Sequence, residues 1–96
     1  MYNSARKYEY LMHYVYILKS LKDESLYIGC TKDLKKRFRE HNNNQSKYTS
    51  TKTPYKLIYY EAYLSIDDAY KREKNLKKFA GSYTQLKRRI TKSLDD

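Results

Sequence analysis

The sequence predicts a small single-domain α/β protein in which helices flank a three-stranded, largely antiparallel sheet. A length of 96 residues leaves room for one modest core. Two segments of strand composition are separated by a short polar turn, which predicts a hairpin, and a third such segment lies downstream. Segments with helical spacing follow the hairpin and the third strand. The predicted order is therefore strand, strand, helix, strand, helix, helix.

The predicted hairpin joins residues 13–19 (HYVYILK) to residues 26–30 (LYIGC) through the polar residues 20–25. The first segment alternates apolar side chains on both faces, with Tyr14, Tyr16 and Leu18 on one face and Val15 and Ile17 on the other. A strand that is apolar on both faces is expected at the centre of the sheet. Gly29 permits either an unusual backbone conformation or the close approach of a neighbouring group.

The third strand is predicted at residues 55–63 (YKLIYYEAY), with Leu57, Tyr59 and Glu61 on the same face. A basic helix is expected between the hairpin and this strand, beginning near Leu34. Either of two residues just before it can accept its first backbone N–H groups, namely Thr31 or Asp33.

Two helices are predicted after the third strand. Ser65 and Asp68 resemble a capping box at the start of the segment SIDDAYKREKNLKKFA. Gly81 is predicted to end that helix in a left-handed conformation. The last helix is expected over SYTQLKRRITKSL, with Leu86, Ile90 and Leu94 facing the core.

Two polar segments flank these elements. Residues 1–11 show no period and read as an N-terminal tail, so the domain is expected over residues 12–94. Met12 precedes the first strand and is a candidate alternative start, the other interpretation being an ordinary tail. Residues 42–54 are expected to form a surface loop that either closes over a bound strand or only connects two elements.

Composition favours a polyanionic partner. With 21 Lys and Arg against 11 Asp and Glu, the net charge is +10, so nucleic acid is the first expectation and an anionic membrane surface the second. No apolar run approaches the roughly 18 residues of a membrane span, and no signal peptide is expected. The single cysteine, Cys30, excludes an internal disulfide and favours a reducing, cytoplasmic location.

Two charged residues stand out from the helical patterns. Glu73 occupies a position between Ala69 and Leu76 where an apolar residue is expected, although it could simply form an i,i+4 surface pair with Lys77. Arg37 flanks the apolar stripe of the basic helix, although it could equally belong to a solvated face. The functional interpretation of both residues is a polar site where the helices meet the hairpin.

These residues together resemble the GIY-YIG nuclease family, in particular small stand-alone members related to the N-terminal domain of excinuclease C. Tyr14-Val15-Tyr16 stands where the family has Gly-Ile-Tyr, and Tyr27-Ile28-Gly29 is the second motif unaltered. Arg37 in LKKRFREH and Glu73 in REKNLKKF match the family's arginine and metal-binding glutamate. The resemblance covers residues 13–92.

The resemblance implies a metal-dependent endonuclease that hydrolyses DNA phosphodiester bonds, in repair, recombination or processing. Glu73 would hold one Mg²⁺ or Mn²⁺ ion, and Arg37 would brace the scissile phosphate. The nucleophile would be water, with Tyr16 or Tyr27 taking, relaying or positioning its proton. His41 would share the acid–base work or bind phosphate.

The sequence departs from the family pattern at three points. The first motif has Tyr14 in place of glycine, and Cys30 stands where excinuclease relatives carry a lysine, a charge that Lys32 could supply. An asparagine that many members place after the glutamate has no clear counterpart, since Asn75 is too close and Gln85 is a weak match.

Seven basic residues on the two central helices and the turn before them are the expected DNA contacts: Lys32, Lys35, Lys36, Arg39, Lys74, Lys77 and Lys78. DNA is thus the expected partner, with a further targeting protein as one source of specificity. The competing interpretation is a non-catalytic nucleic-acid-binding module with the same fold, and a peripheral membrane binder is a third. Glu73 distinguishes the first two, because a pure phosphate-binding face has no use for a carboxylate.

Overall fold

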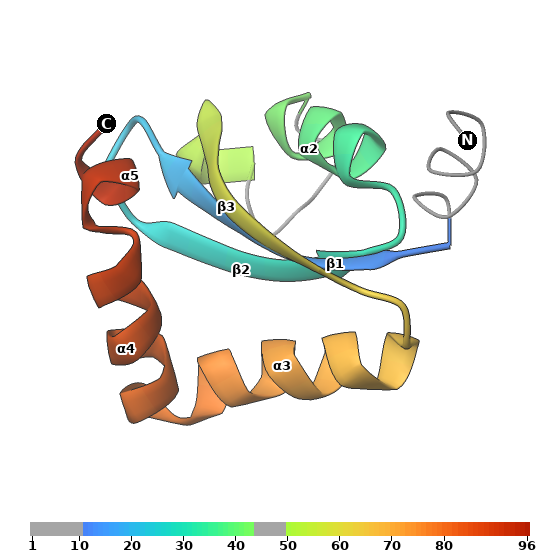
Figure 1. The fold of residues 1–96 in the computed structure, drawn as a ribbon. Coiled ribbons are helices and arrows are strands. Elements are labelled where there is room, and N and C mark those ends of the chain that lie inside the picture. Colours follow the sequence, from blue (N-terminus) through green and yellow to red (C-terminus); the bar gives the residue numbers. More distant parts are fainter. Residues whose placement is uncertain (1–10, 44–49) are drawn as a thin grey trace.

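A computed structural model describes residues 11–43 and 50–96 (Figure 1). Its elements, in chain order, are β1 (His13–Ser20), β2 (Leu26–Thr31), α2 (Leu34–Asn42), the 3₁₀ turn η1 (Ser50–Lys52), β3 (Tyr55–Tyr63), α3 (Ile66–Lys78), α4 (Ala80–Arg89) and α5 (Thr91–Asp95). This order confirms the predicted fold class, with the last predicted helix divided into two.

The described residues form a three-stranded antiparallel sheet in the order β2-β1-β3. The apolar strand β1 is central, as its two apolar faces predict. In the register of the sheet, Tyr16 lies opposite Gly29 on β2 and opposite Tyr60 on β3. Both β2 and β3 are edge strands.

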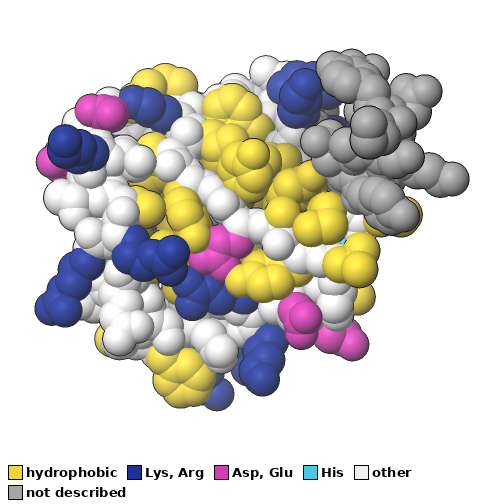
Figure 2. Space-filling model, in the orientation of Figure 1, with side chains coloured by type: hydrophobic (Ala, Val, Ile, Leu, Met, Phe, Trp, Pro, Cys, Tyr) yellow, Lys and Arg dark blue, Asp and Glu magenta, His cyan; other side chains and the backbone are white. Residues whose placement is uncertain are grey.

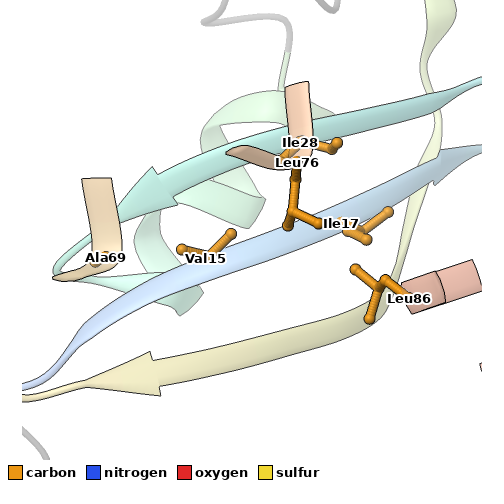
Figure 3. Packing of buried hydrophobic residues seen from close by; sticks show 6 residues of the cluster. All are labelled: Val15, Ile17, Ile28, Ala69, Leu76 and Leu86. Atoms are coloured by element: carbon orange, nitrogen blue, oxygen red, sulfur yellow. The ribbon is translucent and has the colours of Figure 1, made fainter. Parts of the chain in front are cut away.

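The two faces of the sheet are covered by different helices (Figure 1). On one face, α3 and α4 complete a core of Val15, Ile17, Ile28, Ala69, Leu76 and Leu86 (Figure 3). On the other face, Leu34 and Phe38 of α2 pack over Tyr16, Leu18 and Tyr55. The basic helix α2 therefore lies on the opposite side of the sheet from α3.

A bulge in β3 changes the predicted side-chain alternation. Ile17 pairs with Tyr59 but Leu18 pairs with Leu57, so the intervening Ile58 is an extra residue in the ladder. Tyr59 packs with the α3 core whereas Leu57 packs on the α2 side. The prediction that Leu57 and Tyr59 share a face is therefore wrong, because the bulge shifts the two-residue period.

The helix starts follow the predicted capping chemistry. Asp33 accepts a hydrogen bond from the backbone N–H of Lys36 at 3.2 Å, and Ser65 accepts one from the N–H of Asp68 at 3.4 Å. Each side chain satisfies a backbone donor in the first turn. Both predicted caps are confirmed.

The helix boundary after α3 differs from the prediction. Gly81 lies inside α4 and has no positive φ, so it does not end α3. Phe79 does so instead, with an extended backbone (φ −110°, ψ 108°) that breaks the helical path without a left-handed residue. A second break at Ile90, where φ is −120°, separates α5 from α4. The predicted single C-terminal helix is wrong for this reason.

The predictions for the N-terminal tail and for the centre of the 42–54 loop concern residues 1–10 and 44–49, which lie outside the described residues. At the edges of that loop, Asn42 ends α2 and Ser50–Lys52 form η1. Within residues 11–43 and 50–96, the helices lack the length and apolar character needed to cross a membrane.

A polar cluster joins β3 to α3. The Glu61 carboxylate accepts hydrogen bonds from Arg72 Nε at 2.9 Å, from the Tyr59 hydroxyl at 2.7 Å and from the Tyr63 hydroxyl. Burial alone would raise the pKa of Glu61, but the hydrogen bonds from Arg72 and the tyrosines outweigh it and lower the pKa below its usual value. The carboxylate is therefore ionised at neutral pH and fixes α3 against the sheet.

The stability contributed by Glu61 should depend on pH. Because its pKa is lower in the folded chain than in the unfolded one, this contribution is complete above the unfolded value of about 4.3 and is lost as the pH falls through the folded value. Replacing Arg72 with glutamine should cost about 2 kcal/mol at neutral pH and flatten the acid dependence. Thermal melts between about pH 5 and pH 3 check this, with the exposed Lys71→Gln as control. An equally steep acid dependence in Arg72→Gln would contradict it.

Candidate active site

The site begins with the crossing of β1 and β2. The Tyr16 side chain is 1% exposed and lies across Gly29 on the neighbouring strand. A Cβ atom at Gly29 would lie 2.3 Å from the Tyr16 hydroxyl oxygen, which is too close for any real contact. Since Gly29 has no positive φ, its role is close approach and not an unusual backbone conformation.

Gly29→Ala should therefore displace the Tyr16 ring. We expect overpacking to destabilise the protein by roughly 1–3 kcal/mol. Denaturant unfolding measures this, and Gly81→Ala is the matched control, because nothing lies within 4 Å of a Cβ there and the helix should gain up to about 1 kcal/mol. Equal stability of Gly29→Ala and the parent would disprove the close packing.

The Tyr16 hydroxyl meets the end of α2. Its oxygen lies 2.9 Å from His41 Nε2, and the His41 side chain is fully buried. The His41 ring also packs against two other tyrosines, with its centroid 4.9 Å from that of Tyr27 and 6.2 Å from that of Tyr55. The two motif tyrosines are thus neighbours, at 6.3 Å between ring centroids.

Burial sets the protonation of this pair. It raises the pKa of Tyr16 well above the usual value, an effect that Tyr27 increases and Arg37 opposes. Burial also lowers the pKa of His41 to about 4, and the positive charge of Arg37 adds to this effect. At neutral pH the phenol is protonated and the imidazole is neutral, so the Tyr16 O–H can donate to Nε2.

Arg37 lies one turn before His41 on α2, near the Tyr16 hydroxyl, where its charge acts to lower the pKa of Tyr16. Its Nη1 atom is 3.2 Å from the Glu40 carboxylate, and about a third of its side chain is exposed. Arg37 is therefore both oriented by Glu40 and open to an anionic ligand.

Glu73 reaches the same region from α3. Burial raises the pKa of Cys30, which follows Gly29 on β2, and the negative charge of Glu73 adds to this effect; the same charge is a minor cause of the raised pKa of Tyr16, which is due mainly to burial. The Glu73 carboxylate is 3.3 Å from Lys77 Nζ, and 21% of its side chain is exposed. The predicted i,i+4 pair with Lys77 is thus present, and the carboxylate still faces solvent beside the edge strand.

The seven predicted DNA-contacting residues all have exposed side chains. Four of them lie on α2 or in the turn before it, and three lie on α3. Figure 2 shows Lys and Arg side chains over the lower left of the visible face, where Figure 1 places α3 and α4.

Three residues that the sequence did not point to support the site: Glu40, Asn42 and Tyr55. Glu40 pairs with Arg37, and its i,i+3 spacing on a helix could have indicated this. The Asn42 side chain accepts a hydrogen bond from the Tyr55 N–H at 2.6 Å and donates one to the Tyr55 carbonyl at 3.0 Å. These bonds tie the end of α2 to β3 beneath His41, and no local signal predicts them because the two residues are separated by the 44–49 segment.

Comparison with known proteins identifies the family of this chain. A family profile described as the GIY-YIG catalytic domain matches residues 12–87. A UPF0213 protein of Clostridium perfringens is 50% identical over 68 residues, which cover 70% of this chain and 72% of the relative. One from Staphylococcus saprophyticus is 46% identical over 69 residues, covering 71% of this chain and 83% of the relative.

A solved structure shares the architecture. The solution NMR structure of a UPF0213 protein from Bacillus halodurans is 35% identical and aligns with a TM-score of 0.50, covering 78% of this chain and 81% of the other. The UPF0213 proteins are therefore relatives in both sequence and fold. Since the family profile spans most of the chain, this protein belongs to the GIY-YIG family.

Proposed function

We propose that the protein is a metal-dependent DNA endonuclease that hydrolyses phosphodiester bonds in repair, recombination or other DNA processing, in a reducing cytoplasm. The observation that carries the proposal is the contact between the buried Tyr16 phenol and the buried His41 imidazole, 2.9 Å apart, with Arg37 one turn earlier on α2. Glu73 adds a carboxylate from α3, on the other side of the sheet, and its charge acts on Tyr16 and on Cys30 of the edge strand β2. A chain selected only to fold has no need for this combination.

The donor set fits one hard divalent cation. Mg²⁺ is commonly bound by one or two carboxylates together with waters and substrate phosphates, and Mn²⁺ accepts the same ligands. Glu73 offers one partly exposed carboxylate, and residues 11–43 and 50–96 contain no cluster of three or more metal-ligating side chains. When bound, the cation would neutralise charge on the phosphate and make water more acidic. On binding the cation, the Glu73 carboxylate would leave its ion pair with Lys77.

The protein side of the reaction rests on Tyr16 and His41. A water that donates to the Tyr16 oxygen would be held near the scissile phosphate. As the water oxygen attacks phosphorus, its proton passes to the phenol oxygen while the phenol proton moves to His41 Nε2, 2.9 Å away. The bond between phosphorus and the leaving sugar oxygen breaks, and that oxygen takes a proton from solvent. The phenol remains neutral in this relay, so its raised pKa is no obstacle.

The Tyr16 hydroxyl occupies Nε2 of His41, which favours a relay role for His41 over direct contact with phosphate. Tyr27 is half-buried beside both groups, and its ring packs against His41 edge-on, so we assign it to positioning the water. Arg37 would bind the non-bridging phosphate oxygens and stabilise the negative charge that develops there.

A second candidate is a nucleic-acid-binding module without catalysis. The observation that favours it is the Glu73–Lys77 ion pair, which accounts for Glu73 without a metal ion. Exposed lysines and arginines alone would then give salt-dependent binding with little sequence preference.

A cleavage assay distinguishes the two candidate functions. Purified protein is incubated with supercoiled, branched and single-stranded DNA, together with Mg²⁺, Mn²⁺ or a chelator. Metal-dependent cleavage of at least one form is the expected result. Binding to all forms with no cleavage under either metal would favour the binding module.

Arg37→Lys keeps the charge but removes the planar fork. We expect it to lower the single-turnover cleavage rate roughly 100-fold while changing DNA affinity little. The exposed Arg39→Lys, on the same helix, is the control and should cleave at nearly the parent rate. Equal rates for the two variants would remove Arg37 from the proposed mechanism.

A further inference from the structure

A groove of about 530 Å³ runs along the free edge of β2, on the side of the sheet covered by α3 and α4. Six residues line it: Leu26, Tyr27, Ile28, Leu76, Lys77 and Tyr83. Three of these are aliphatic and form the floor, with Leu76 1% exposed and Ile28 8% exposed. The groove is not needed for the chemistry described above.

The groove adjoins the proposed active site at two points. Tyr27 belongs to both, since its ring packs against His41 while the residue lines the groove. Lys77 also lines the groove and forms the ion pair with Glu73, one helical turn away. A ligand in the groove would therefore lie next to Tyr27 and to the Glu73–Lys77 pair, beside the place proposed for the metal ion.

The walls combine apolar, aromatic and cationic groups. Tyr83 of α4 is half-buried, and Lys87 Nζ lies 4.6 Å from the centroid of its ring. Lys77 contributes a second ammonium group. A free phosphate would have no use for the aliphatic floor, and an aliphatic ligand would have no use for two ammonium groups. A nucleotide satisfies both, because its base is flat and apolar on its faces and its phosphate is anionic.

We propose that this groove binds an unpaired base of the DNA strand next to the cleaved phosphodiester, with the base against Tyr83 and the flanking phosphate against Lys77 or Lys87. The proposal rests on the proposed endonuclease function for the identity of the strand. It gives the enzyme a substrate class: DNA with at least one unpaired nucleotide beside the cut, such as a single strand, flap or branch.

The geometry of duplex DNA explains the preference. A paired base is stacked inside the helix and cannot enter a groove in the protein unless it is extruded, which costs unpairing and unstacking energy. An unpaired base is free to enter without this cost. Charge alone, by contrast, would favour any DNA form according to its phosphate density.

NMR spectroscopy of the wild-type protein locates the base. We titrate a deoxynucleoside monophosphate into protein labelled at Leu and Ile methyl groups, with chelator present. Ring currents from a bound base should shift the methyl signals of Leu26, Ile28 and Leu76 upfield. An absence of shifts at these methyls, or shifts confined to other residues, would overturn the proposal.

Affinity measurements test the role of Tyr83. In chelator, fluorescence anisotropy is recorded for a labelled single strand and for a blunt duplex. Tyr83→Leu should weaken binding of the single strand roughly tenfold and change binding of the duplex little, whereas Tyr83→Phe should bind like the parent. The matched control Tyr70→Leu removes a tyrosine that is 54% exposed on α3 and should have no effect.

Equal weakening of both DNA forms, or equal effects of Tyr83→Leu and Tyr70→Leu, would count against the base site. Circular dichroism melts establish that each variant is folded, and the methyl titration decides the matter if Tyr83→Leu is not. Neither measurement reads cleavage. If the protein binds a base but cuts no DNA, the endonuclease proposal is refuted and the base site in the groove is retained. If it cuts DNA but binds no base, the base site is refuted and the endonuclease proposal is retained.

Discussion

Replacing Glu73 with glutamine is expected to reduce DNA cleavage at least about 1,000-fold, because the amide keeps the shape of the side chain but loses the negative charge that would hold a divalent cation. DNA binding should persist or strengthen slightly, since a negative charge is removed from a basic region. Stability should change little, because the Glu73–Lys77 pair is a partly exposed i,i+4 pair worth about 0.3–0.5 kcal/mol. Single-turnover cleavage and anisotropy on the same preparation measure both quantities.

Asp67→Asn is the matched control for Glu73→Gln. Asp67 lies in the first turn of the same helix and is exposed, so the same loss of one charge should leave the cleavage rate within about twofold of the parent. If Glu73→Gln and Asp67→Asn cleave equally well, Glu73 does not hold the metal. If both bind more tightly and neither variant nor parent cleaves, the binding module is the better explanation.

Tyr16→Phe should lower the cleavage rate about 100- to 10,000-fold, the usual loss when a positioned proton-transfer group is removed. The phenyl ring can occupy the space over Gly29, so the sheet should stay intact. Loss of the hydrogen bond to the buried His41 Nε2 should cost about 1–3 kcal/mol of stability. Cleavage is therefore compared well below the melting temperature of the variant.

Two other Tyr→Phe variants serve as comparisons for the cleavage rate of Tyr16→Phe. Tyr27→Phe should be slower than the parent but faster than Tyr16→Phe, because Tyr27 is assigned to positioning the water and not to relaying its proton. Tyr60 lies opposite Tyr16 on β3 and is 52% exposed, so Tyr60→Phe should cleave normally. If Tyr27→Phe lowers the cleavage rate more than Tyr16→Phe does, Tyr27 relays the proton and Tyr16 positions the water.

Local patterns in the sequence predicted most elements of the fold. The apolar run around Val15 and Ile17 predicts a central strand, since only a strand covered on both faces tolerates it. Ser65 predicts the start of α3 because its hydroxyl can accept a hydrogen bond from an N–H in the first turn of the helix. These signals come from residues a few positions apart in the sequence, so they do not depend on how distant segments pack.

The differences arise where distant residues decide the outcome. The bulge at Ile58 depends on how β3 pairs with β1 across the sheet, and no pattern within β3 encodes it. Gly81 could end a helix, but Phe79 does so first. Local propensity describes what each residue permits, and packing selects among the permitted conformations.

The candidate site was predictable as a set of residues but not as an arrangement. Tyr16, Arg37 and Glu73 follow from their motifs and from charges placed against apolar stripes. The Tyr16–His41 hydrogen bond joins residues 25 positions apart and depends on the register of Tyr16 opposite Gly29. The groove beside the site requires the turn between α3 and α4, where the predicted helix boundary is wrong.

The proposed nuclease site is tested most directly by one nicking experiment on supercoiled plasmid with fluorescence anisotropy recorded in parallel. The reaction of the wild-type protein is started with Mn²⁺, excess chelator is added midway, and Mn²⁺ is then restored. We expect nicking that stops on chelation and resumes with the metal while the DNA stays bound throughout. Nicking that continues in chelator would contradict the metal role of Glu73, and bound DNA that is never nicked would contradict the enzyme.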